Sequence, residues 1–277
     1  MIEMSLPIHW NAEALWETVA PQLPGFTVEI LPSVDSSNTE LMRRARNGDT
    51  APTLLVAEQQ TAGRGRMGKP WASSLGDSLM FSLSLPLAPS DWSGLSLAVG
   101  QVLAEALQPG AAPIAASPSA TPRIGIKWPN DLWLEGDRKL AGILIETAHF
   151  GGPGPRQVIV GVGINVRPRH EQDLSTPPAC LQDLDPRWEA PAALAAVIPA
   201  LVNCLQRFEA QGFAPFQPAF AQRDLLRGRP VRLSDGTQGM AEGVGLDGAL
   251  LVRTAQGLSH ITSSEVSVRP QTPSTAG

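Results

Sequence analysis

The sequence predicts an α+β protein in two parts, a domain of mixed helices and strands up to about residue 226 and a small β-barrel after it. Helix and strand patterns alternate through the first part. From about Arg227 the chain contains only short β runs, interrupted by Ser-Asp-Gly, Leu-Asp-Gly and Ala-Gln-Gly. Asp-Gly between apolar runs is a strong hairpin signal. Of the 277 residues, 43% are apolar and 17% charged, so there is ample material for a core.

Helical patterns occur in five segments, where apolar residues recur at intervals of three and four or where capping signals are present. In the second segment, Ser37 and Glu40 form a capping box and Gly48 is a stop signal. The expected helices cover residues 11–20, 37–48, 93–110, 191–212 and 216–224.

Strand patterns separate these helices. The expected strands cover residues 26–34, 53–59, 78–87 and 157–167, with three more between 123 and 147. Residues 78–87 alternate in character. The Pro/Ala/Ser-rich insert within 109–123 indicates a surface loop or a disordered segment, and residues 271–277 are expected to be a disordered tail.

Charge and composition exclude several classes of protein. The net charge is −5, so no global basic field exists to hold DNA, RNA or an anionic membrane. No uninterrupted apolar stretch reaches the ~20 residues that a membrane-spanning helix needs. No basic residue precedes Arg43, so a secretory signal is not expected. Cys180 and Cys204 are too few for a disulfide framework or a tetrahedral zinc site, which predicts a cytoplasmic protein.

The lysine content is unusual. Of the 21 basic residues, 18 are Arg and only Lys69, Lys127 and Lys139 are Lys. A coding bias would replace Lys with Arg wherever any cation suffices. All three lysines lie in motif-like segments, so we expect that they need the chemistry of an ammonium group.

A glycine loop covers Gly63–Lys69 and matches G-x-G-x-x-G. A dinucleotide-binding turn must open a helix, but Pro70 and a strand follow this loop. Its glycines would let backbone N–H groups approach an anion, and two Arg forks would bind the anion's oxygens. The alternative is a solvated basic loop.

Lys127-Trp128-Pro129-Asn130-Asp131 places a cation, an amide and a carboxylate around a proline turn. Asn and Asp oxygens can bind Mg²⁺, or the carboxylate can act as a base. The alternative is a simple Asx turn. Trp128 has the character of a core residue.

Two further segments could contribute to a site. In 138–146, Lys139 precedes Ala141 and Gly142, which would let a ligand lie against the backbone; a basic hairpin tip is the alternative. In 161–166, Asn165 is a polar residue at the end of a buried strand and needs partners, as a backbone clamp or as a ligand contact.

The order of these motifs, GRGRMGKPW, KWPNDLWL, RKLAGILIE and GVGINV, closely resembles that of the biotin protein ligase family. The resemblance runs from about Asp35 to Asn165 and resumes in the C-terminal β segment. It implies a central mixed or antiparallel sheet with flanking helices and an SH3-like C-terminal barrel. Met67 and Lys69 depart from the family loop, where Arg is common at both positions.

The resemblance also implies roles for residues. For biotin binding these are Ser36, Ser37, Gln60, Gly63, Arg64, Lys139 and Gly142. For ATP and the adenylate they are Arg66, Lys69, Trp71, Asn130, Asp131 and Asn165. Catalysis is assigned to Arg64, Arg66, Lys127, Asp131 and Lys139, and Mg²⁺ to Asn130, Asp131 and the ATP phosphates.

The implied reaction has two steps. The biotin carboxylate attacks the α-phosphorus of ATP to give biotinyl-5′-AMP, and a lysine of a biotin carboxyl carrier protein then takes the biotin. The carrier would belong to acetyl-CoA carboxylase or a similar carboxylase, and Asp131 is the candidate base. Only some 30 residues precede the resemblance, so we expect a monofunctional enzyme without a DNA-binding repressor module. Family members often dimerise through the central sheet, so a homodimer is compatible with this reading.

Two alternatives remain at this point. A lipoate ligase or octanoyltransferase has a related fold, but lacks this GRGR loop, and the transferase needs a nucleophilic Cys. A non-catalytic biotin sensor or DNA-bound repressor is disfavoured by the net charge.

Overall fold

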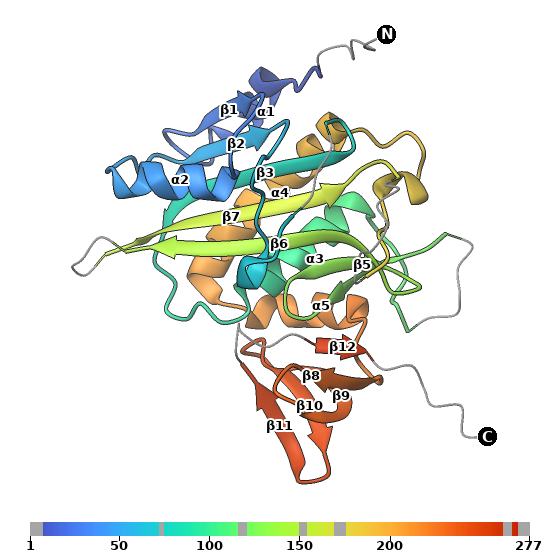
Figure 1. Cartoon of the computed structure of the whole chain (residues 1–277). Helices are drawn as coiled ribbons and strands as arrows, with labels where there is room; N and C mark the ends of the chain where they lie inside the picture. Colours follow the sequence, from blue (N-terminus) through green and yellow to red (C-terminus); the bar gives the residue numbers. More distant parts are fainter. Residues whose placement is uncertain are drawn as a thin grey trace.

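A seven-stranded sheet organises the larger part of the molecule (Figure 1). The computed structural model describes residues 8–71, 75–115, 121–149, 154–168, 176–262 and 268–270. The strand order is β1-β2-β3-β7-β6-β5-β4; β1 and β2 are parallel and all other neighbours antiparallel. The strands are β1 (Thr27–Leu31), β2 (Thr53–Ala57), β3 (Ser78–Leu87), β4 (Ile124–Lys127), β5 (Asp131–Leu134), β6 (Arg138–Ala148) and β7 (Arg156–Asn165). The expected α+β fold with a central mixed sheet is confirmed.

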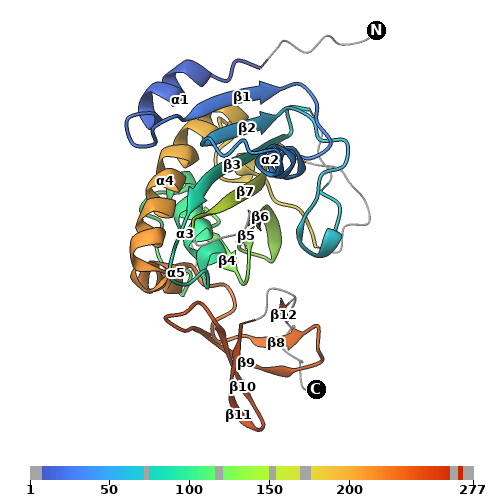
Figure 2. The same cartoon turned by 90° about the vertical axis from the view of Figure 1, so that its left-hand side faces the viewer.

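Four helices cover one face of this sheet (Figure 2). They are α1 (Ala12–Val19), α3 (Leu95–Leu107), α4 (Ala190–Gln211) and α5 (Gln217–Arg223). Their apolar residues and those of the sheet form the main core. α4 is long and apolar enough to cross a membrane by length and composition. It lies against α3, α1 and β3, however, and its buried side chains belong to the core, so it is a core helix.

The opposite face is only partly covered. α2 (Ser37–Arg46) packs there over a small apolar cluster that includes Leu41, Leu55 and Ile159. Beyond α2 this face carries mostly small or polar residues of β3, β6 and β7, such as Ser82, Gly161 and Gly163, while the alternate residues of these strands face the main core. The exposed half of this face is the floor of the cavity described below.

One detail of the sequence prediction is wrong here. The N-cap of α2 is Ser36, whose hydroxyl accepts from Thr39 N at 3.5 Å, and not Ser37, whose side chain points to β3. The alternating character of β3 is present, with Leu and Phe facing the main core, but its serine face is buried too, because Ser82 and Ser84 find buried polar partners.

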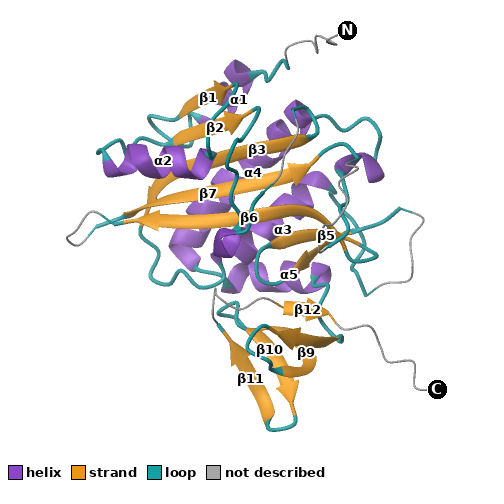
Figure 3. Cartoon of the chain, viewed as in Figure 1, coloured by secondary structure: helices purple, strands orange, loops and turns teal. Residues whose placement is uncertain are grey.

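From Pro230 on, the regular elements among the described residues are all strands (Figure 3). They are β8 (Pro230–Leu233), β9 (Gln238–Val244), β10 (Leu250–Thr254), β11 (Gly257–Ile261) and β12 (Val268–Pro270), in the order β11-β10-β9-β8-β12. The pairings of the described residues give an open antiparallel sheet, with β11 and β12 at its edges, and do not close a barrel. The expected tail 271–277 and the middle of the insert, 116–120, lie outside the described residues.

Specific contacts attach this sheet to the larger part. Trp128 Nε1 donates to Gly248 O at 3.1 Å, so this buried motif residue is a packing contact, as expected. Arg229 forms a two-pronged ion pair with Asp137, with both N–O distances 2.7 Å. These contacts hold the C-terminal sheet at the end of the central sheet where β4, β5 and β6 lie.

Candidate functional site

One large cavity lies on the open face of the central sheet. Its volume is about 550 Å³. Of the residues predicted to bind or catalyse, all except Gly63 line it, from Ser36 and Ser37 at one end to Lys127, Asp131 and Lys139 at the other. Residues far apart in the sequence thus meet in one place, as the motif order predicts.

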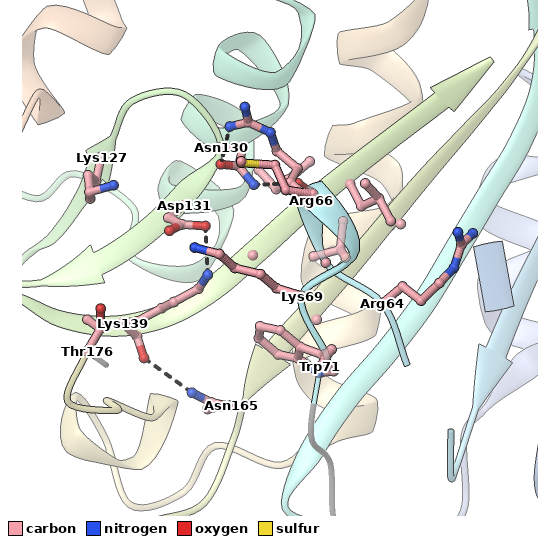
Figure 4. Close-up of a pocket in the computed structure, with 18 of the residues that line it drawn as sticks. Arg64, Arg66, Lys69, Trp71, Lys127, Asn130, Asp131, Lys139, Asn165 and Thr176 are labelled. Carbon is pink, nitrogen blue, oxygen red and sulfur yellow. Dashed lines mark hydrogen bonds and ion pairs between the residues drawn. The ribbon is translucent and has the colours of Figure 1, made fainter. Parts of the chain in front are cut away.

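The cationic end of the cavity gathers around one carboxylate (Figure 4). Asp131 Oδ1 lies 2.8 Å from the ammonium of Lys139. Lys127 is buried, and its ammonium lies 5.1 Å from the ring centre of Trp133. Burial lowers the pKa of Lys127 to about 8; Asp131 opposes this shift, and the charge of Lys139 adds to it. Lys139 lies within β6 and not at a hairpin tip.

Arg66 reaches the same end from the glycine loop. Its Nη1 donates to Asn130 Oδ1 at 2.9 Å, while Asn130 Nδ2 donates to Ile143 O at 2.8 Å. Burial lowers the pKa of Arg66, against the attraction of Asp131. Arg66 Nη2 is buried without a partner among the described residues. It is therefore a free donor for an anionic oxygen.

Trp71 forms the wall between the two ends. A Cβ at Gly163 would lie 2.4 Å from the indole and one at Gly142 would lie 3.2 Å from it. The ring thus rests on the backbone of neighbouring strands at two paired glycines. A Cβ at Gly63 would lie 2.6 Å from Trp71 O, so this glycine is a close-approach position of the loop and does not line the cavity.

The opposite end is polar. Gln60 Oε1 accepts from Ser37 N at 2.8 Å, and Ser37 Oγ lies 2.7 Å from Ser82 Oγ. Arg64 also lies here, with its guanidinium 3.3 Å from the Glu146 carboxylate. Arg64 therefore points away from Arg66 and from the cationic end (Figure 4).

Asn165 is a backbone clamp in this structure. Its Nδ2 donates to Lys139 O at 3.2 Å and to Ala179 O at 3.0 Å. Lys139 N in turn donates to Pro177 O at 2.8 Å. Asn165 therefore fixes the strand that carries Lys139 to the segment that covers that end of the cavity.

Several residues of the site were not expected from the sequence. Asn38, Glu146, Gly161, Gly163 and Arg269 all participate, by lining the cavity or by bonding its lining residues. The buried Ser82 bonds the polar end from behind. Gly161 and Gly163 stand inside the motif GVGINV, where the spacing of small residues was the available signal. Arg269 is brought to the cavity only by the attachment of the C-terminal sheet.

Comparison with known proteins agrees with this geometry. The model of the biotin/lipoate A/B protein ligase family matches residues 31–165, and that of the biotin protein ligase C-terminal domain matches 227–269. A biotin–[acetyl-CoA-carboxylase] ligase of Paracoccus denitrificans is 33% identical over 245 residues, which cover 86% of this chain and 98% of the relative. The chain belongs to the biotin protein ligase family.

Other members differ in extent. The bifunctional ligase/repressor BirA of Escherichia coli K12 is 34% identical over 258 residues, which cover 90% of this chain and 76% of BirA. A biotin protein ligase from Aquifex aeolicus, solved in complex with biotin and ATP, has a TM-score of 0.71 and 28% identity; the match covers 88% of this chain and 99% of that one. This chain is accordingly an enzyme, a biotin–protein ligase.

Proposed function

We propose that the cavity activates biotin with ATP to biotinyl-5′-AMP and passes the biotin to a lysine of a biotin carboxyl carrier protein. The observation that carries the proposal is that one cavity has a polar end, at Ser37 and Gln60, and a cationic end, at Lys127 and Lys139. A cyclic urea suits the first, and a carboxylate meeting phosphates suits the second. The assigned roles of the other lining residues are part of this proposal.

In the first step two anions must approach each other, so fixed cations are required. Lys139 would hold the biotin carboxylate, while Lys127 and Arg66 would hold phosphate oxygens. Arg66 supports this role, since its Nη2 is buried and has no partner among the described residues. Trp71 would form one wall of the reacting centre, since its ring rests on the backbone at Gly142 and Gly163.

Mg²⁺ fits this site as a companion of ATP. The described residues contain no group of three or more His, Cys, Asp or Glu side chains for a resident ion. Asp131 would supply one carboxylate oxygen, and the amide oxygen of Asn130 already accepts from Arg66. This donor set suits an ion held mainly by phosphates, whose charge it would neutralise.

In the second step the acceptor lysine must lose a proton before it attacks the acyl carbonyl. Asp131, which lies beside Lys139 at the cationic end, would take that proton. Cys180 and Cys204 are buried and lie outside the cavity lining, and burial raises the pKa of the Cys204 thiol to about 12. Neither thiol suits an acyltransferase nucleophile, which favours the ligase over the octanoyltransferase.

The test is pyrophosphate exchange into ATP, measured with biotin and with lipoate, followed by transfer to a carrier domain. We expect biotin-dependent exchange and labelling of one carrier lysine. Exchange that depends on lipoate and not on biotin would overturn the proposal.

We further propose a cytoplasmic enzyme without operator binding, divided near residue 226 into residues 1–226 and 227–270. The net charge of −5 supports the absence of operator binding, and the start of β8 at Pro230 supports the division. A salt-sensitive gel shift on a specific DNA at nanomolar protein would contradict the absence of operator binding.

A further inference from the structure

A buried chain of hydrogen bonds lies behind the polar end of the cavity. Ser82 Oγ lies 2.7 Å from Ser37 Oγ and 2.6 Å from Asn38 Oδ1. Asn38 Nδ2 lies 3.2 Å from Leu144 O and 2.9 Å from Glu146 Oε2. Ser82 itself is fully buried and does not line the cavity.

The donors and acceptors of this chain can be assigned. A backbone carbonyl only accepts, so the side of the Asn38 amide that faces Leu144 O must be its NH₂ group. Asn38 Oδ1 therefore faces Ser82 and can only accept. The proton between Ser82 and Asn38 must come from Ser82, because a hydroxyl carries one proton.

The second contact then needs its own proton. Because the Ser82 hydroxyl donates its one proton to Asn38 Oδ1, the proton between Ser82 and Ser37 must come from Ser37. Gln60 Oε1 is a competing acceptor, but it lies 3.3 Å from Ser37 Oγ, against 2.7 Å for Ser82. The Ser37 hydroxyl consequently directs only lone pairs at the cavity.

The sheet is built to admit this chain. Ser82 and Leu144 pair with Gly161 from its two sides, so all three lie in one row across β3, β7 and β6. A Cβ at Gly161 would lie 2.0 Å from Asn38 Oδ1. Glycine at this position is thus required for the Asn38 amide to reach both Ser82 and the β6 backbone.

We propose that Ser82, Asn38 and Glu146 are positioning residues that fix the Ser37 hydroxyl as a hydrogen-bond acceptor and so select a ligand N–H. The inference rests on the proposed function, in which the ligand at this end is a cyclic urea. Glu146 contributes by accepting from Asn38 Nδ2 and is itself paired with Arg64.

The test uses biotin and two cyclic carbamate analogues, each with one ureido N–H replaced by oxygen. The wild type should reject the analogue whose oxygen faces Ser37, by about 10- to 100-fold in kcat/KM relative to biotin, because two acceptors would then face each other. In Ser82→Ala the Ser37 proton is released and can turn to the ligand. Discrimination against that analogue should fall to within about threefold, while KM for biotin rises about 3- to 10-fold and KM for ATP does not change.

Ser84→Ala is the matched control. Ser84 lies on the same strand and face, is buried, and accepts from Gln157 Nε2 at 2.8 Å, but it lies outside the cavity lining. It should leave the discrimination unchanged. If Ser82→Ala does not fold, Ser82→Cys is the second variant, since a thiol is nearly isosteric but a weak donor and acceptor.

The outcomes distinguish failure of the proposed function from failure of the role of Ser82. Absence of biotin-dependent exchange in the wild type would overturn the proposed function and this inference with it. Normal exchange, combined with equal losses for biotin and both analogues in Ser82→Ala, would overturn the inference alone, as would a wild type that accepts both analogues like biotin. Loss of discrimination in Ser82→Ala but not in Ser84→Ala would support it.

Discussion

Asp131 Oδ1 lies 2.8 Å from Lys139 Nζ, across the neighbouring strands β5 and β6. The carboxylate proposed as the base is therefore paired with the cation proposed to hold biotin. In the proposed reaction this pairing would orient Asp131 before substrates bind, and it would be released for proton transfer when Lys139 turns to a substrate carboxylate.

Asp131→Asn should slow transfer to the carrier more than adenylate formation. Asn preserves the shape and can still bond Lys139, but it removes the base, which typically contributes 10²- to 10⁴-fold. We expect a transfer loss in about that range and an adenylation loss of about tenfold or less. Single-turnover measurement of each half-reaction separates the two. Equal losses would indicate that Asp131 serves only to position Mg²⁺.

Lys139→Arg should not be conservative. Lys139 Nζ lies 5.7 Å from the centre of the Trp71 ring, and a Cβ at Gly142 would lie 3.4 Å from Lys139 Nζ. The compact ammonium of Lys fits this space, whereas the wider planar guanidinium of Arg does not. Loss of one charge-assisted hydrogen bond in the transition state costs about 2–4 kcal/mol, so adenylation should drop about 30- to 1000-fold.

Arg138→Lys is the control for this substitution, since Arg138 precedes Lys139 on β6 and pairs with Asp183 outside the cavity lining. Pyrophosphate exchange of the two variants should differ by at least tenfold. Near-normal exchange in Lys139→Arg would remove both the proposed role and the significance of the three lysines.

ATP affinity should fall as pH rises through about 8. Burial lowers the pKa of Lys127 to about 8, so the charged form that attracts phosphate is lost above that pH. We expect KM for ATP to rise about tenfold between pH 7 and pH 9. Lys69→Met should weaken ATP binding but keep this pH step, because Lys69 is exposed.

Lys127→Met should abolish the pH dependence of KM for ATP and also stabilise the fold. In the folded state the pKa of Lys127 is below its unfolded value, so holding the charge there destabilises the protein below about pH 8, and the penalty fades as pH rises toward 10.5. The free energy of unfolding at pH 7 should therefore rise by about 1–3 kcal/mol, as measured by chemical denaturation. A less stable Lys127→Met would show that the ammonium is well paired.

The residues of the cationic end could be grouped from the sequence because they are close in the chain. Lys127 and Asp131 flank one turn between β4 and β5, and Lys139 lies on the next strand of the same antiparallel run. Spacing alone brings such residues together. The glycine loop carries recognisable residue types, so its place over the cavity followed from the motif order.

The polar end could be predicted only in part. Ser82, Glu146 and Gly161 lie on three strands, and only the register of β3, β7 and β6 unites them. The serines of β3 give the strand its alternating character in the sequence. The sequence cannot show, however, that buried partners bond these serines. The same limit made Ser37 resemble a helix N-cap, a role that its neighbour Ser36 takes.

The last prediction concerns the attachment of the C-terminal sheet. Arg229 and Asp137 form a two-pronged ion pair, and Asp137 lies in the turn two residues before Lys139 with a φ of 59°, in the left-handed region. Few non-glycine residues adopt this conformation, and Asp is among those that do so most readily. The pair thus fixes both the sheet and the turn that leads into Lys139.

Arg229→Met should lower the free energy of unfolding by only about 1 kcal/mol or less, because both side chains are partly exposed. Adenylation should fall about 3- to 10-fold, since a looser turn displaces Lys139. The hydrogen bonds from Arg229 lower the pKa of Asp137, so the stabilisation is present above the unfolded pKa of that carboxyl and is lost as pH falls through the folded value.

Arg253→Met is the matched control, since Arg253 pairs with Glu242 within the C-terminal sheet and neither residue lines the cavity. It should cost similar stability, by chemical denaturation, and leave adenylation unchanged. If the two variants lose the same activity, the ion pair at Asp137 stabilises the sheet but does not position Lys139. Loss of adenylation in Arg229→Met alone would show that the C-terminal sheet acts on catalysis through this contact. High salt should then lower the adenylation rate of the wild type toward that of Arg229→Met, because salt screens a partly exposed pair.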